Sequence, residues 1–257
     1  MSKLHFQLEG IGVWAPGISG LEQLQTAAGQ PLAPPSDASR PPAAALSPNE
    51  RRRAPEGVLL AVEVAGQAIG MSGRDPASLL SVFASCRGDQ TISDYMCRTL
   101  AEDPFALSPT RFHNSVHNAP AGYWGIASGA VGTSSAISTE PRWPGLSLLD
   151  AITLALCERQ PVLWVCSETR GSGPLLRLSG YTAGMACALV IAPPDPAGSH
   201  LRLEAELITT TGRPDTTGHP VAGLLPWLAG LEQGGESRLA ISPGQALRLQ
   251  TWPGDQP

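Results

Sequence analysis

Apolar and polar positions along the chain follow two patterns that alternate. Short segments that are mostly apolar, β-branched or small predict strands at residues 6–14, 79–85, 133–138, 162–166, 183–191 and 201–211. Between them lie segments that predict helices, at residues 21–28, 47–53, 56–70, 94–100, 120–130 and 146–159. This order of elements predicts an α/β fold with layers of buried helices and a mostly parallel central sheet.

Two adjacent segments carry the clearest helix signals. Ser47 can cap a helix, Pro48 suits the first helical position, and Glu50 completes a capping box. After Pro55, the segment 56–70 has its polar residues on one stripe and is apolar elsewhere. We therefore expect this second helix to be buried on most of its sides.

The length and composition fit one main domain. The chain has 257 residues, of which 42% are hydrophobic, enough for a sizeable core. We expect a domain at residues 1–211. A C-terminal extension, 212–257, has weaker signals for a helix at 224–232 and for short strands at 238–241 and 246–251. We expect this extension to pack on the domain or on a partner.

Charge and hydropathy exclude several classes of function. The formal net charge is −5, without a basic face, so nucleic acid is not an expected partner. Lys3 is the only lysine, which argues against Schiff-base and lysine general-base mechanisms. No segment approaches the roughly 18 apolar residues that a membrane span requires. The N-terminus lacks the pattern of a signal peptide, so we expect a cytoplasmic protein.

The cysteines do not form a metal-binding or disulfide pattern. They are Cys86, Cys97, Cys157, Cys166 and Cys187, without CxxC spacing. An odd number of cysteines without a leader indicates reduced thiols. Buried free cysteine mostly behaves as a small hydrophobic residue, so we predict no metal site here.

The densest group of polar side chains lies between two predicted elements and comprises His113, Asn114, His117 and Asn118. A four-residue histidine spacing suits zinc only on a helix that brings a third ligand. Pro120 and the asparagines favour a loop instead, in which these side chains satisfy backbone groups or lie at an interface. The neighbouring serines are not part of a GxSxG motif, and the glycines at 171–173 indicate a simple loop.

The strongest functional signal lies at residues 108–139, which read SPTRFHNSVHNAPAGYWGIASGAVGTSSAIST. An Asn-containing loop, a small-residue helix, a turn at Gly132 and a strand follow one another. This order resembles the stretch that leads to the nucleophile in β-ketoacyl synthases of the thiolase fold. Further segments resemble that family in the same order, at residues 10–17, 47–73, 81–89 and 180–191.

The resemblance stops where the chemistry of that family begins. There the strand leads directly into a reactive cysteine, whereas here it is followed by Thr139, Glu140, Pro141, Arg142, Trp143 and Pro144. The family's second half, with two histidines and a lysine, has no counterpart. The resemblance therefore implies the N-terminal half of a synthase, without catalytic residues of its own. We interpret the 139–144 segment as a surface loop, or as a plug in which Trp143 closes a tunnel of the partner.

The resemblance also implies partners. Truncated, chain-length-factor-like proteins of this kind pair with a full-length β-ketoacyl synthase as a heterodimer. They serve aryl polyene, type II polyketide or fatty acid synthesis. The synthase would act on phosphopantetheine-linked acyl groups, so this chain needs no cofactor and meets the acyl carrier protein indirectly, with Arg51, Arg52 and Arg53 as candidates for docking. Thiolase-fold halves pair through the strand before the nucleophile, so the expected interface is Phe112, His113, Asn114, His117, Asn118, Thr133, Ser134, Ser135, Ala136, Ile137 and Ser138.

Two other functions remain open from the sequence. One is an acyltransferase with a displaced nucleophile, either Cys157 or Cys166. The other is an independent module that binds acyl groups or a carrier protein. A homodimer is also possible, because the same edge strand can pair with its own copy.

Overall fold

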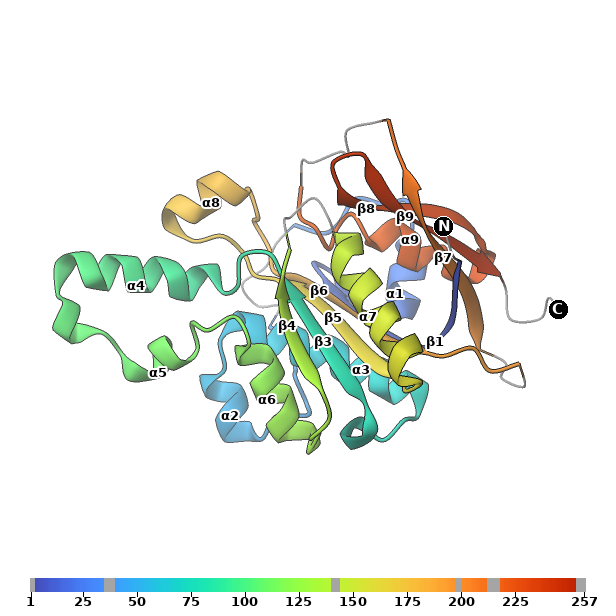
Figure 1. Cartoon of the computed structure of the whole chain (residues 1–257). Coiled ribbons are helices and arrows are strands. Elements are labelled where there is room, and N and C mark those ends of the chain that lie inside the picture. The colour runs from blue at the N-terminus through green and yellow to red at the C-terminus, as the bar shows by residue number, and fades with distance from the viewer. Residues whose placement is uncertain (1–2, 35–39, 140–143, 197–199, 212–217, 253–257) are drawn as a thin grey trace.

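A computed structural model of the protein describes residues 3–34, 40–139, 144–196, 200–211 and 218–252. A central sheet is covered by helices on both faces (Figure 1). The strands are β1 (Leu4–Ala15), β2 (Ile18–Ser19), β3 (Leu80–Ser85), β4 (Ser134–Ser138), β5 (Val162–Glu168), β6 (Met185–Ala192), β7 (Leu201–Thr209), β8 (Gly235–Ser242) and β9 (Gln245–Trp252). The helices are α1 (Leu21–Thr26), α2 (Pro48–Arg53), α3 (Glu56–Ser72), α4 (Gln90–Glu102), α5 (Pro109–His113), α6 (Ala119–Ser128), α7 (Pro144–Glu158), α8 (Gly173–Ser179) and α9 (Leu225–Ala229), with 3₁₀ turns η1 (Pro76–Ser78), η2 (Pro104–Ala106) and η3 (Leu231–Gln233).

The strand order in the sheet is β4-β3-β5-β6-β1-β7-β9-β8, and β2 pairs with β1. The α/β class and the layered arrangement are confirmed, but the sheet is mixed rather than mostly parallel. Within the described residues, parallel pairing joins β3 to β4 and to β5, and the other pairings are antiparallel. The connection between β5 and β6 explains part of this difference. Between β5 and β6, α8 packs against α4 instead of covering the sheet, so the chain returns antiparallel.

Side chains of the buried strands alternate between two cores. On β5, Val162 and Trp164 join the core under α7 and α9, whereas Leu163 and Val165 join the core under α3 and α6. Both faces are covered, which explains why this strand is a continuous apolar run in the sequence.

Helix α3 lies directly against β1 because two glycines leave room for it. A Cβ atom at Gly10 would lie 2.0 Å from the backbone oxygen of Ala68, and one at Gly12 would lie 2.0 Å from that of Val64. The Gln67 side chain then accepts a hydrogen bond from the Val13 amide at 2.9 Å. This close approach buries most of α3, as its apolar pattern predicts.

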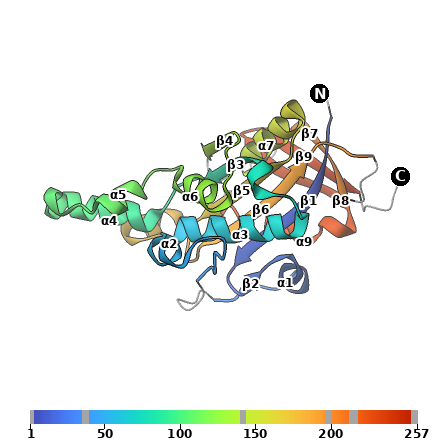
Figure 2. The same cartoon turned by 90° about the horizontal axis from the view of Figure 1, so that it is seen from below.

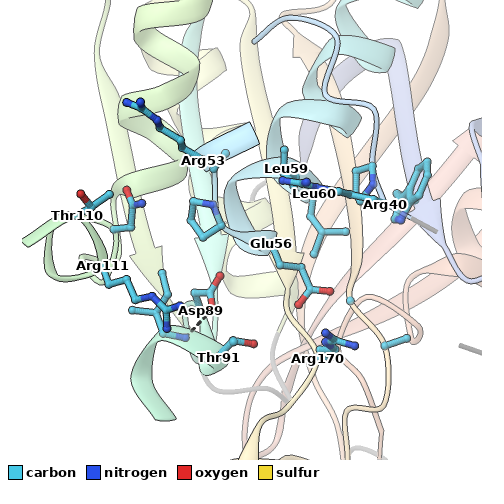
Figure 3. A pocket seen from close by; sticks show the side chains of 18 of the residues that line it. Arg40, Arg53, Glu56, Leu59, Leu60, Asp89, Thr91, Thr110, Arg111 and Arg170 are labelled. Carbon is cyan, nitrogen blue, oxygen red and sulfur yellow. Dashed lines mark hydrogen bonds between the residues drawn. The ribbon is translucent and has the colours of Figure 1, made fainter. Parts of the chain in front are cut away.

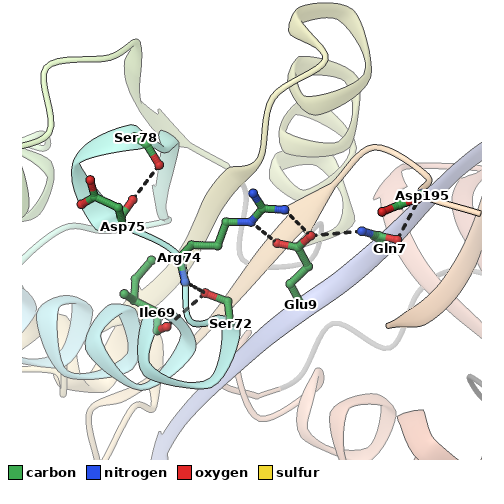
Figure 4. Close-up of polar contacts among 8 residues, drawn as sticks. All are labelled: Gln7, Glu9, Ile69, Ser72, Arg74, Asp75, Ser78 and Asp195. Atoms are coloured by element: carbon green, nitrogen blue, oxygen red, sulfur yellow. Dashed lines mark hydrogen bonds and ion pairs between the residues drawn. The ribbon is translucent and has the colours of Figure 1, made fainter. Parts of the chain in front are cut away.

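An ion pair between the partly exposed Arg74 and the buried Glu9 fixes the other end of α3 to the same strand (Figure 4). Arg74 donates from Nε and Nη2 to the two carboxylate oxygens of Glu9, at 2.5 and 2.6 Å. Gln7 donates to Glu9 at 3.0 Å. Burial would raise the pKa of Glu9, but the hydrogen bonds from Arg74 and Gln7 and the Arg74 charge outweigh it and hold the pKa below its usual value.

Helix α2 begins with the capping box that the sequence predicts. Ser47 Oγ accepts from the Glu50 amide, and the Glu50 carboxylate accepts from the Ser47 amide at 3.2 Å. Gly171 and Ser172 lie in a loop, as expected, and Gly173 begins α8. Pro174 follows at the start of this helix, a position that suits proline.

Two regions extend the layered core. The C-terminal hairpin of β8 and β9 continues the sheet from β7, and α9 contributes Leu228 to the core under α7. At the opposite end, α4 and α5 project away from the sheet in both views (Figures 1 and 2). In the strand order, the β8–β9 hairpin forms one end of the sheet and β4 forms the other.

Candidate functional site at the β4 edge

Strand β4 is the last strand of the sheet on its side. It pairs in parallel with β3, and the described residues provide no strand on its outer side. The Ser81 amide donates to the Thr133 carbonyl at 3.0 Å, so by alternation the N–H of Ala136 points outward. Ser134, Ala136 and Ser138 are exposed. The edge therefore offers unpaired backbone groups to another strand.

Exposed apolar side chains lie on α5, on α6 and in the segment before β4. Phe112 on α5 is 56% exposed, Ile126 on α6 is 76% exposed, and Val131, just before β4, is 95% exposed. Val116, between α5 and α6, is also exposed. Helix α6 lies beside β4 (Figure 1), so Ile126 and Val131 belong to segments next to the edge, whereas α5 with Phe112 lies farther away. Apolar patches of this kind mark interaction surfaces.

The predicted His/Asn group takes different positions in this region. Phe112 and His113 are exposed on α5, and Asn118 is exposed at the N-terminus of α6. Asn114 is buried and accepts a hydrogen bond from the Tyr123 hydroxyl at 3.3 Å. His117 Nε2 lies 3.0 Å from the Ser85 carbonyl oxygen. Among the residues that the structure describes, no group of His, Cys, Asp or Glu could hold a metal ion.

A buried polar cluster lies where β3, β4 and β5 end. Glu168 Oε1 accepts a hydrogen bond from the Cys86 amide, and Cys86 Sγ lies 3.8 Å from Thr139 Oγ1. The Tyr181 and His219 rings are 4.7 Å apart. Among the described residues, Glu168 Oε2 and both ring nitrogens of His219 have no hydrogen-bond partner.

The segment of the expected nucleophile is only partly described. Thr139 is buried against Cys86, and Pro144 is the first residue of α7. Glu140, Pro141, Arg142 and Trp143 lie outside the described residues. The interpretation of Trp143 as a plug therefore stays a prediction.

The sequence matches a known protein family. Residues 24–228 match the N-terminal domain of β-ketoacyl synthases, and this span is most of the chain. The chain belongs to the β-ketoacyl synthase family. No curated protein matches the sequence.

Solved structures share the fold of this synthase domain. The ketosynthase ApeO in complex with its chain length factor ApeC, from Xenorhabdus doucetiae, matches with a TM-score of 0.72 at 21% identity, over 96% of this chain and 99% of that chain. AntDE:AntF, a type II PKS acyl-carrier protein in complex with its ketosynthase, matches with a TM-score of 0.77 at 13% identity, over 98% and 100%. The ishigamide ketosynthase/chain length factor matches with a TM-score of 0.64 at 17% identity, over 80% and 67%. At these identities the likenesses show the fold.

The surroundings of this cluster in the synthase domain disfavour the charged forms of its side chains. Burial raises the pKa of the Cys86 thiol above its usual range, and the neighbouring Glu168 raises it further. Burial also raises the pKa of Glu168, raises that of Tyr181 to about 12, and lowers that of His219 to about 4. A neutral thiol without a charged base is a poor nucleophile.

The two cysteines considered as displaced nucleophiles are also poorly placed for this role. Cys166 is buried on β5, and the adjacent Cys187 thiol and burial raise its pKa. Cys157 is exposed near the end of α7. The Cys187 thiol and burial therefore keep the Cys166 thiol protonated, and no described contact activates Cys157 in this synthase domain.

The sequence did not predict that the residues of this cluster lie together. Cys86 and His219 are far apart in the chain, and Glu168 and Tyr181 belong to no recognisable motif. The available signal was a glutamate at the end of a fully apolar strand, because a buried carboxyl group requires partners.

The arginine triplet lies on α2. Arg51 donates to the Pro42 carbonyl at 3.3 Å, Arg52 donates to the Asn49 side chain at 2.9 Å, and Arg53 lines a pocket. Its role in carrier docking stays a prediction.

No helix within the described residues of this synthase domain is long and apolar enough to cross a membrane.

Proposed function

We propose that this chain is a non-catalytic, chain-length-factor-like subunit of a β-ketoacyl synthase complex. It pairs through β4 with a full-length synthase and shapes the acyl pocket of that partner during polyene, polyketide or fatty-acyl elongation. The observation that carries the proposal is the bare β4 edge, with its outward backbone groups and adjoining apolar side chains.

The similar structures support this kind of assembly. Two of them are described as a ketosynthase with its chain length factor, and a third contains a ketosynthase with an acyl-carrier protein. The first of these matches a chain of nearly the same length as this one, because almost all of both chains is covered.

The Cys86 cluster supports the absence of chemistry on this chain. Acyl transfer from a thioester requires a thiolate, whereas burial and Glu168 keep Cys86 protonated. The partner would supply the nucleophile and act on phosphopantetheine-linked acyl groups, so no cofactor is proposed for this chain. The carrier protein would meet the complex indirectly, with Arg51, Arg52 and Arg53 available on α2.

Co-expression with the full-length β-ketoacyl synthase of the same organism tests the proposal. We expect one complex of one copy of each chain in size-exclusion chromatography with mass determination. We also expect elongation activity that neither chain has alone. A chain that never joins the synthase contradicts the proposal, and acyl transfer by this chain alone favours the displaced-nucleophile enzyme.

A proline at Ala136 sharpens the test. Ala136→Pro removes an outward N–H without removing a hydrogen bond to β3, so the subunit should still fold but lose the partner. Ala136→Thr is the matched control, because threonine keeps the N–H and favours strands. Equal partner binding by both variants would mean that the edge is not the interface.

A further inference from the structure

A second concave site lies away from the β4 edge (Figure 3). Its volume is about 740 Å³, and its walls come from α2, the first turns of α3 and α4, and α5. None of the described residues that line it belongs to β4. Pockets of this size commonly hold small organic ligands.

Arginines gather around this pocket although the protein is acidic. Arg40, Arg53, Arg111 and Arg170 come from four separate segments, in a chain with a net charge of −5. Figure 3 shows Arg111 and Arg170 on either side of the carboxyl groups of Glu56 and Asp89. The Arg40 guanidinium donates to the Arg51 carbonyl at 2.9 Å, so Arg111 and Arg170 are the pair that favours an anionic ligand.

Both carboxylate oxygens of Asp89 accept hydrogen bonds from backbone amides. Its Oδ1 accepts from the Ile92 amide at 3.0 Å, and its Oδ2 accepts from the Gly57 amide at 3.2 Å. It thereby caps α4 and satisfies an N-terminal donor of α3. Asp89 therefore holds two helix ends and keeps its negative charge, which offsets one of the four arginines.

Glu56 compensates only part of the positive charge. Burial raises the pKa of Glu56 to about 7, against the opposing effect of the Arg170 charge. Near neutral pH a large fraction of this side chain is therefore protonated. Its Oε2 atom is buried and has no hydrogen-bond partner among the described residues.

The remaining walls combine apolar surface with a fixed donor. Trp14, Leu59 and Leu60 give the pocket an apolar side. The Arg111 guanidinium carbon lies 3.9 Å from the centre of the Tyr95 ring, which fixes the plane of the guanidinium and leaves its N–H edge available. The site thus offers a charged side and an apolar side to one ligand.

We infer that this pocket binds a small organic anion, a phosphate monoester with an apolar segment, whose charged group contacts Arg111 and Arg170 and whose apolar segment contacts Leu59 and Leu60. Phosphate is favoured because its oxygens can accept from several guanidinium groups at once. The site is independent of the proposed pairing through β4.

Calorimetric titration of the full chain with hexyl phosphate, inorganic phosphate and hexanol tests the inference. We expect hexyl phosphate to bind at least about tenfold more tightly than either fragment, because each fragment uses one side of the pocket. Equal or weaker binding of hexyl phosphate overturns the inference.

Charge-matched variants locate the binding. Arg111→Gln and Arg170→Gln should each weaken binding of hexyl phosphate about tenfold, the value of one charge-assisted contact. Arg177→Gln is the control, because it removes the same charge from α8, outside the pocket. Retained binding in both pocket variants, or an equal loss in the control, overturns the assignment.

A probe of constant charge tests the part played by Glu56. The charged groups that face Glu56 are Asp89 and Arg170, with the other three arginines on the remaining walls. Hexyl sulfate should bind more weakly as pH rises from 6 to 8, by about three- to tenfold, because Glu56 ionises in this range. Glu56→Gln should abolish the change, and an unchanged pH profile in this variant contradicts the assigned role.

Discussion

At the scale of single residues, the environment of each ionisable group decides its behaviour. Glu9 and Glu168 are both buried glutamates at the sheet. Glu9 has Arg74 beside it and a lowered pKa, whereas Glu168 receives backbone hydrogen bonds but no described cation and has a raised pKa. Glu9 therefore contributes a stabilising charge, whereas burial disfavours the charged form of Glu168 beside Cys86.

Removal of Arg74 should destabilise the protein. Arg74→Met leaves the Glu9 carboxylate buried, and breaking a fully buried pair costs about 3–5 kcal/mol. Because the Arg74 side chain is 42% exposed, we expect about 2–3 kcal/mol in urea unfolding. Arg238→Met, which breaks the exposed pair with Glu236, should cost less than about 1 kcal/mol. Similar losses in both variants would contradict the assigned role of the pair.

The same pair predicts a sensitivity to acid. Since the pKa of Glu9 is lowered by folding, its contribution is fully present above the ordinary value of 4.5 and is lost as pH falls through the lowered value. The free energy of unfolding should decline below pH 4.5 less steeply in Glu9→Gln than in the wild type. Parallel declines would show that Glu9 does not titrate with a lowered pKa.

The thiols should differ in reactivity. We expect iodoacetamide at pH 7.5 to modify the exposed Cys97 and Cys157 first, because the thiolate is the reactive form and Cys86 and Cys166 are held protonated. Mass spectrometry of digests measures the order, and protein unfolded in urea is the control in which all cysteines react. Faster modification of Cys86 than of Cys97 would favour an activated nucleophile.

At the scale of elements, contact between α3 and β1 depends on the missing side chains of two glycines. Gly12→Ala places a methyl group against the Val64 carbonyl, so the helix must move away. We expect a loss of more than about 2 kcal/mol in thermal unfolding. Gly66→Ala lies on α3 with open space around its Cβ and should stabilise by about 0.5–1 kcal/mol. A tolerated Gly12→Ala would contradict the close packing.

Elements with local signals could be predicted from the sequence, whereas their assembly could not. The capping box at Ser47 and the apolar pattern of α3 are local and are confirmed. The direction of β6 depends on where α8 packs, which no local pattern encodes. The Cys86 cluster and the arginine pocket each bring together residues that are far apart in the sequence. Their burial and the charges around them therefore could not be predicted from local sequence.

At the scale of the whole molecule, the C-terminal hairpin completes the core. Leu247 and Leu249 on β9 are fully buried, and β9 covers the outer side of β7. Deletion of residues 212–257 should therefore expose apolar surface and a second strand edge, and yield aggregated protein in sedimentation assays. Arg238→Ala on the exposed side of β8 should remain in the supernatant. A well-behaved truncated chain would mean that the hairpin is dispensable for the core.

The two ends of the sheet are chemically unequal. The far end is β8, whose first half is exposed and carries the Glu236–Arg238 ion pair, whereas β4 has exposed serines and alanine beside apolar side chains. Charged side chains discourage strand addition at the β8 end. With pairing through β4 as proposed, the β8 end would offer no further growth point, so a pair would not extend into fibres.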